Sequence, residues 1–174
     1  MTKLTITPAE LFTRSDYERL PDGFPCELVE GQLVKEPAPI YRHQRVIVRL
    51  IAALLETVGA DRAVTAPIDL FIDDHNVLQP DVAVFATALA RDVRHIPTPQ
   101  IVVEVLSPST AARDRGRKTG IYLRAGVGEV WLIDPYSGSI EVHTSLGVTG
   151  NAGHEVVRSD VIAEVALRGA DLIR

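Results

Sequence analysis

The chain has 174 residues, 46% of them hydrophobic, which is enough to bury one core without disulfides, so we expect a single domain over residues 1–174. Its formal net charge of −5 argues against a protein that coats nucleic acid non-specifically, because such binding depends on a broad cationic surface. No apolar run reaches membrane-spanning length and no hydrophobic signal region opens the sequence, so we expect a soluble cytoplasmic protein without a membrane partner.

The first third of the chain predicts a helix, a hairpin and a second helix. Residues 7–10 have the pattern of a capping box and predict the start of a short helix. Two apolar runs then flank Glu30–Gly31, which predicts an added N-terminal β-hairpin in which Gly31 takes a positive φ. The single cysteine, Cys26, lies in this hairpin and is expected to be a small, half-buried apolar side chain. Apolar residues at helical spacing predict a long helix from about Arg42 to Val58.

The remaining chain alternates short strands with one helix. Residues 101–106 are β-branched and aliphatic, which predicts a strand buried on both faces. Residues 111–124 predict a helix that stops at Gly126. Other short apolar runs predict strands at residues 63–66, 68–72, 81–85, 129–134 and 140–143. This order predicts an α/β (α+β) fold with a mixed central sheet flanked by helices, in which strand 101–106 lies near the centre.

Two carboxylates and a lysine lie at positions that suggest chemistry. Glu104 is in the middle of the buried strand, which is unfavourable unless the carboxylate pairs with a cation or metal or takes up a proton. Asp81 opens another apolar strand, and Lys118 lies in the helix that follows Glu104. Two carboxylates on neighbouring strands with a lysine close by suit a hard divalent cation and a water nucleophile that attacks a phosphodiester.

Positive charge is concentrated around these residues. Residues 51–90 carry one basic and six acidic side chains, whereas residues 91–124 carry seven basic and three acidic ones. Such a cluster is either a solvated face or a surface that meets phosphates.

Three stretches together carry a resemblance to a known family: 79–84 (QPDVAV), 103–110 (VEVLSPST) and 126–135 (GVGEVWLIDP). With Asp114, Lys118 and Tyr122, they resemble the signature of the Uma2 family, also called DUF820, which is similar to restriction endonucleases of the PD-(D/E)XK fold. The resemblance extends to residues 26–31 and to His43. The nuclease pattern puts a lysine two residues after the strand acid, where this chain has Leu106, and the resemblance implies that the lysine has moved to the next helix as Lys118. Val130 replaces the tyrosine that the family usually has before the tryptophan, a difference that we expect to affect packing more than chemistry.

The resemblance implies a role for each residue. Asp81 and Glu104, with the carbonyl of Val105, would hold Mg²⁺ or Mn²⁺. Lys118 would orient water or stabilise charge on the phosphorus centre, and we prefer the second role because a catalytic base would need a depressed pKa. Glu27 would be a further ligand or a water-orienting group, because the resemblance places the hairpin near the site.

Three further residues are predicted to bind substrate: His43, Arg113 and Arg117. Each assignment has a structural alternative. Lys118 fits a surface ion pair with Asp114, and Glu104 fits a buried structural pair with that same lysine. Asp81 fits a strand-end cap, Glu27 an exposed hairpin acid, and His43 a packing or capping residue.

The sequence thus predicts a Mg²⁺-dependent endonuclease acting on nucleic acid, and DNA is the favoured substrate. A catalytically idle nucleic-acid-binding or regulatory module, and a metal-dependent hydrolase of another phosphate ester, are the alternatives. A binding module has no need of a carboxylate pair that repels phosphate, which favours catalysis. A homodimer is expected from the family and from the requirements of cutting two strands.

Overall fold

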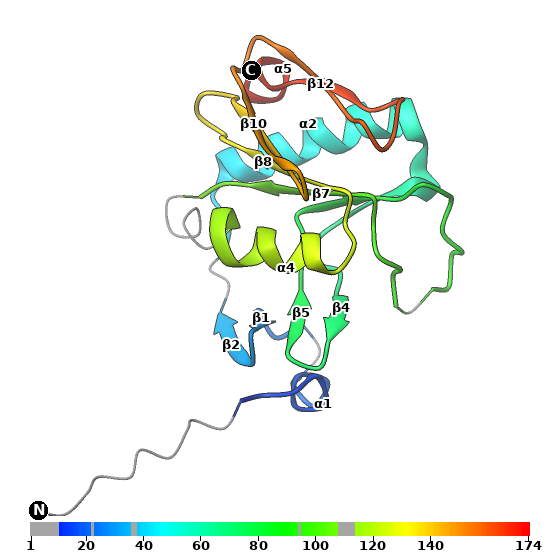
Figure 1. The fold of residues 1–174 in the computed structure, drawn as a ribbon, viewed down its shortest axis with the longest axis vertical. Coiled ribbons are helices and arrows are strands. Elements are labelled where there is room, and N and C mark those ends of the chain that lie inside the picture. Colours follow the sequence, from blue (N-terminus) through cyan, green and yellow to red (C-terminus); the bar gives the residue numbers. More distant parts are fainter. Residues whose placement is uncertain (1–10, 22, 36–37, 94, 108–113) are drawn as a thin grey trace, which may run out of the picture.

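The computed structural model describes residues 11–21, 23–35, 38–93, 95–107 and 114–174. These residues form a six-stranded sheet, a four-stranded sheet and a two-stranded ribbon, with helices on both faces of the larger sheet (Figure 1). None of the helices in the described part of the chain is long and apolar enough to cross a membrane.

The six-stranded sheet is mixed, as predicted. Its strands run in the order β10-β9-β8-β7-β6-β3, and only β7 and β8 pair in parallel, while the other neighbours are antiparallel. The strands are β3 (Ala63–Thr65), β6 (Val82–Val84), β7 (Ile101–Val105), β8 (Glu129–Ile133), β9 (Ile140–Thr144) and β10 (Gly147–Asn151). Every residue of β7 and β8 is buried, because both strands are interior and both faces of the sheet are covered.

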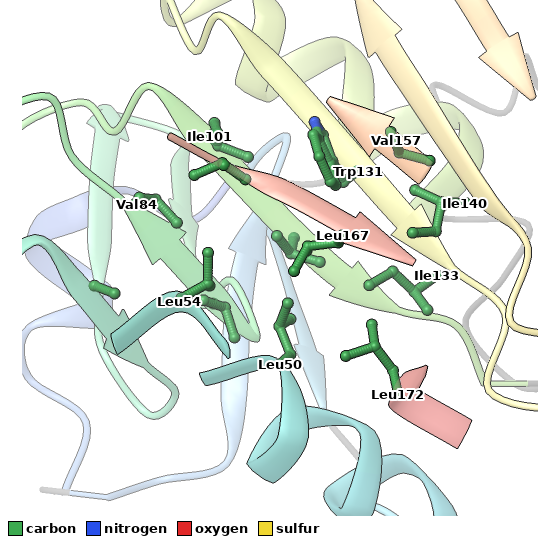
Figure 2. Packing of buried hydrophobic residues seen from close by; sticks show 14 of the residues in the cluster. Leu50, Leu54, Val84, Ile101, Trp131, Ile133, Ile140, Val157, Leu167 and Leu172 are labelled. Atoms are coloured by element: carbon green, nitrogen blue, oxygen red, sulfur yellow. The ribbon is translucent and has the colours of Figure 1, made fainter. Parts of the chain in front are cut away.

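The two sheet faces pack against different helices. Alternate residues of β7, such as Val103 and Val105, pack with α2 (Tyr41–Val58) in a core that also holds Trp131 (Figure 2). Val102 faces the other way, toward α4 (Thr119–Arg124), which forms part of the crossover that joins the parallel strands β7 and β8. Because side chains alternate along a strand, Glu104 must also lie on the α4 side.

The predicted hairpin belongs to a second sheet. Its strands β1 (Cys26–Val29) and β2 (Gln32–Lys35) meet at Glu30 and Gly31, which both have positive φ, of 49° and 75°. The order of this sheet is β2-β1-β5-β4, so β5 (Asn76–Leu78) and β4 (Leu70–Asp73) extend the hairpin, which the sequence did not predict. Cys26 is buried rather than half-buried, because it packs inside this small sheet with Leu28 and Val77.

The helices differ from prediction mainly at their ends. The first helix, α1 (Arg14–Tyr17), is capped by Thr13 and Asp16, whereas the predicted capping box at residues 7–10 lies outside the described residues. The long helix α2 agrees with the prediction and is followed by the short 3₁₀ helix η1 (Ala60–Arg62). The predicted helix at 111–124 is instead a π-helical turn, η2 (Asp114–Lys118), that continues into α4.

The C-terminal segment is held by close backbone contacts. It contains the ribbon strands β11 (Val156–Arg158) and β12 (Ala166–Arg168) and the helix α5 (Gly169–Ile173), which lies beside α2. At the start of α5, a Cβ atom on Gly169 would collide with the backbone carbonyl of Gly138. Only glycine allows the two backbones to approach this closely.

We therefore predict that Gly169→Ala lowers stability by about 2 kcal/mol, because the colliding atoms belong to backbone and cannot rotate away. The expected fall in thermal midpoint is about 5 °C for a domain of this size. Gly150→Ala is the matched control, since nothing lies within 4 Å of a Cβ at that position. Equal melting temperatures for the two variants would contradict the prediction.

Candidate active site

Asp81 lies just before β6 and joins three elements. Its Oδ2 accepts a hydrogen bond of 2.8 Å from the backbone N–H of Val105, at the end of β7. The same oxygen lies 3.1 Å from Nε2 of His43, in the first turn of α2. The next residue, Val82, pairs with Val103, so Asp81 and Glu104 each adjoin this pair on neighbouring chain segments. Asp81 therefore brings the long helix and the two carboxylate-bearing strands to one place.

Glu104 makes buried contacts with the crossover. Its side chain is only 6% exposed, and Oε1 lies 2.8 Å from Nζ of Lys118. The same oxygen accepts a 2.8 Å hydrogen bond from the hydroxyl of Tyr122. Both partners come from the segment that follows β7, and they are four residues apart, so they lie on one face of the helix.

Glu27 reaches the same lysine from the small sheet. Its Oε1 lies 2.9 Å from Nζ of Lys118 and accepts a 2.7 Å hydrogen bond from the backbone N–H of Gln79. Glu27 is fully buried and Lys118 is 4% exposed. One ammonium group therefore lies between two buried carboxylates from different sheets. We call Glu27, Glu104 and Lys118 the buried ion triad.

These contacts test the structural roles that the sequence left open for Lys118, Glu27, Glu104 and Asp81. A surface ion pair does not describe Lys118, which is buried, and the side chain of Asp114 lies outside the described residues. An exposed hairpin acid does not describe Glu27. The buried pair of Glu104 with Lys118 is present, and Asp81 does cap a backbone N–H of the next strand.

The buried side chain of Lys118 comes from an unusual stretch of helix. Lys118 is the last residue of the π-helical turn η2, and α4 begins at the next residue. A π-helical turn widens the helix and shifts the side chains that follow it, and such turns are frequent at functional sites. Of the predicted common face of Asp114, Lys118 and Tyr122, the structure shows that Lys118 and Tyr122 share it, and the side chain of Asp114 lies outside the described residues.

Tyr122 was part of the sequence motif, but its contact with Glu104 was not predicted. Burial, followed by the negative charge of Glu104, raises the pKa of the Tyr122 phenol well above its ordinary value. The hydroxyl is thus a neutral hydrogen-bond donor rather than a base. Its position four residues after Lys118 was the signal that could have revealed the contact.

One predicted substrate-binding arginine, Arg117, lies outside this cluster. The side chain of Arg117 is 62% exposed, and its Nε lies 3.8 Å from Oε2 of Glu30. Arg113 lies outside the described residues. The crossover thus presents Arg117 to solvent while it buries Lys118.

The donor chemistry of the cluster suits a hard cation. Asp81, Glu104 and Glu27 supply carboxylate oxygens, which Mg²⁺ and Mn²⁺ prefer. Oε2 of Glu27 is buried without a hydrogen-bond partner in the described structure. However, no group of three or more His, Cys, Asp or Glu side chains among the described residues is arranged to hold a metal ion. Carboxylate oxygens suited to a hard cation are therefore present, and the ammonium of Lys118 lies between two of these carboxylates.

Comparison with known proteins identifies the family. The sequence model of the Uma2 family, described as "Putative restriction endonuclease", matches residues 14–169. The chain belongs to the Uma2 family. The residues that match the Uma2 model include every described site residue from Glu27 to Tyr122. The match supports a nuclease-like function.

A solved structure supports the Uma2 fold. It is described as the crystal structure of a putative nuclease belonging to DUF820 from Anabaena variabilis ATCC 29413. The two chains share 21% identity with a TM-score of 0.79, over 93% of this chain and 97% of the other. No curated protein matches the chain. The nuclease-like fold predicted from the sequence is thus confirmed.

The buried ion triad of this Uma2 chain leads to a prediction about stability. Lys118→Met would leave Glu27 and Glu104 buried without the ammonium that bridges them. We expect a loss of about 3–5 kcal/mol at neutral pH, measured by chemical denaturation.

A combined variant and a surface variant serve as controls. Adding Glu27→Gln and Glu104→Gln to Lys118→Met should restore most of the stability, because no buried charge of the triad remains. Arg19→Met breaks an exposed ion pair with Asp16 and should have little effect. A Lys118→Met protein as stable as Arg19→Met at neutral pH would show that the triad is not a stabilising unit.

Proposed function

We propose that this protein is a metal-dependent endonuclease that hydrolyses phosphodiester bonds of DNA. The observation that carries the proposal is the meeting of Asp81, Glu104 and Glu27 at the end of β7, beside a buried lysine, in a chain of the Uma2 family. Cytoplasmic location and action as a homodimer on both strands are part of the same proposal.

The proposed metal ligands are Asp81, Glu104 and the carbonyl of Val105. Glu27 would be a further ligand or would orient water. A bound Mg²⁺ or Mn²⁺ would polarise the phosphate and lower the pKa of a bound water. Asp81 is 18% exposed, whereas Glu104 is 6% exposed, so the cluster is open to solvent on the Asp81 side.

The chain's own groups have separate proposed tasks. Lys118 holds Glu27 and Glu104 in place. It also supplies the positive charge that the nuclease pattern places two residues after the strand acid, where this chain has Leu106. Tyr122 donates a hydrogen bond to Glu104 and fixes the orientation of that carboxylate. His43 lies against Asp81, and its proposed tasks are to orient that carboxylate and to contact a substrate phosphate.

One observation favours a second candidate, a nucleic-acid-binding module without catalysis. Both carboxylate contacts of Lys118 are short, so the ammonium is already neutralised before any substrate arrives. A lysine held in this way supplies less positive field to a phosphate than a lysine facing the substrate. The two candidates differ in whether divalent metal leads to cleavage.

Asp81→Asn tests the proposed function directly. This change keeps the shape of the side chain but removes the charge that a hard cation needs. With Mg²⁺ or Mn²⁺ present, we expect the variant to cleave plasmid DNA at least about a hundredfold more slowly than the unaltered protein. It should also lose the rise in melting temperature that Mn²⁺ gives to the unaltered protein.

Asp171→Asn is the matched control, since that aspartate pairs with Arg174 in α5 and should leave both measurements unchanged. Metal-independent cleavage, or equal rates for the two variants, would refute the proposed metal site. Binding of DNA without cleavage under any metal would favour the idle module.

Arg117→Ala tests the phosphate-positioning role. Its exposed guanidinium should release about one counterion on binding, so the variant should bind DNA more weakly and with a flatter dependence on salt. Fluorescence anisotropy across a salt series measures this slope. An unchanged slope would remove Arg117 from the proposed interface.

A further inference from the structure

Exposed aromatic and arginine side chains meet at the first turn of α2. Tyr41 is 78% exposed and Tyr136 is 55% exposed. The guanidinium carbon of Arg42 lies 4.7 Å from the ring centroid of Tyr136, and that of Arg45 lies 5.8 Å from the ring centroid of Tyr41. We call Tyr41, Arg42, Arg45 and Tyr136 the α2 platform. Large exposed side chains that gather in one place mark surfaces that bind partners.

The α2 platform is continuous with the candidate active site. His43 follows Arg42 in the sequence and lies 3.1 Å from Asp81. Tyr136 lies in the turn after β8, at the edge of the sheet where the parallel strands β7 and β8 both end. The platform is therefore linked to the candidate active site through His43, which contacts Asp81.

The charge of the α2 platform suits phosphate. Residues 40–49 carry three arginines and no acidic residue, although the whole chain has a net charge of −5. Arg45 donates a hydrogen bond to the backbone oxygen of Arg174, the last residue of the sequence, and no ion pair joins Arg42 to a carboxylate side chain within the described part of the chain. The nearby acid Asp134 accepts hydrogen bonds from the backbone N–H groups of Tyr136 and Ser137, which stabilise its turn.

We propose that the α2 platform binds a DNA strand with unpaired bases, so that the bases stack on Tyr41 and Tyr136 while the arginines contact the phosphates. An aromatic ring can stack only on a base whose face is open, and a duplex covers these faces everywhere except at ends and gaps. This inference rests on the proposed function and narrows its substrate class to single strands and the unpaired parts of duplexes. The small cationic area of the α2 platform fits this substrate class, because so few arginines neutralise only a few phosphates and base stacking must supply part of the binding energy.

Two exposed residues elsewhere provide matched controls. Phe24 is 46% exposed and lies beside the small sheet, away from α2. Arg14 lies over the ring of Phe71, with 4.2 Å from its guanidinium carbon to the ring centroid, which reproduces the pairing of Arg42 with Tyr136. Phe24→Ala and Arg14→Gln therefore remove the same chemistry from a different surface.

The test is fluorescence anisotropy of the full chain in EDTA, with a labelled single strand and with the blunt duplex of the same sequence. Tyr136→Ala should weaken single-strand binding about tenfold, as expected for the loss of one stacked base, and should change duplex binding less than about twofold. Arg42→Gln should weaken single-strand binding and flatten its salt dependence. Both control variants should bind as the unaltered protein does, and melting curves should show that all four variants fold.

The outcomes separate this inference from the proposed function. If Tyr136→Ala and Arg42→Gln bind like their controls while the unaltered protein still cleaves DNA, the platform is refuted and the nuclease stands. If single-strand binding depends on Tyr136 but no metal supports cleavage, the platform stands and the nuclease fails. Equal losses for single strand and duplex would refute stacking on unpaired bases, and absence of any DNA binding would overturn both.

Discussion

The candidate site depends on one buried ammonium group between two carboxylates. Lys118 Nζ lies 2.8 Å from Glu104 and 2.9 Å from Glu27, and all three side chains are almost fully shielded from water. Burying charges is costly, and the cost is offset only when opposite charges and hydrogen-bond donors are well placed. Gln79 and Tyr122 supply two such donors. The two sheets and the crossover are therefore fixed relative to one another by a polar contact rather than by apolar packing alone.

The same three side chains, with Asp81, also determine the net charge of the site. Two carboxylates and one ammonium leave an excess of negative charge, to which Asp81 adds from the neighbouring strand. Such an excess favours a divalent cation and disfavours an approaching phosphate unless a cation is present. This charge balance supports the proposed metal dependence. The positive charges of Arg117 and of the α2 platform belong to exposed side chains outside the buried ion triad.

Much of this arrangement follows from the alternation of side chains along β7. Residues 101–106 are apolar except for Glu104, so β7 had to be buried and its carboxylate had to find a partner. Alternation then decides that Glu104 faces α4 while Val103 and Val105 face α2. The connection from β7 to β8 is parallel and needs a helical crossover, which brings Lys118 and Tyr122 back over the strand.

The sequence alone determined the mixed sheet, the long helix, the hairpin turn at Gly31 and the family, because these depend on local periodicity, turn chemistry and a contiguous motif. Only the tertiary structure decided that β1 and β2 join β5 and β4, and that Glu27 is therefore buried against Lys118. Periodic patterns in a sequence are local and do not specify which distant strands pair. For the same reason they do not reveal a contact between Glu27 and Lys118, which lie far apart in the chain. Nor could periodicity reveal the π-helical turn that ends at Lys118, because the winding of one helical turn depends on tertiary contacts that the spacing of apolar residues does not record.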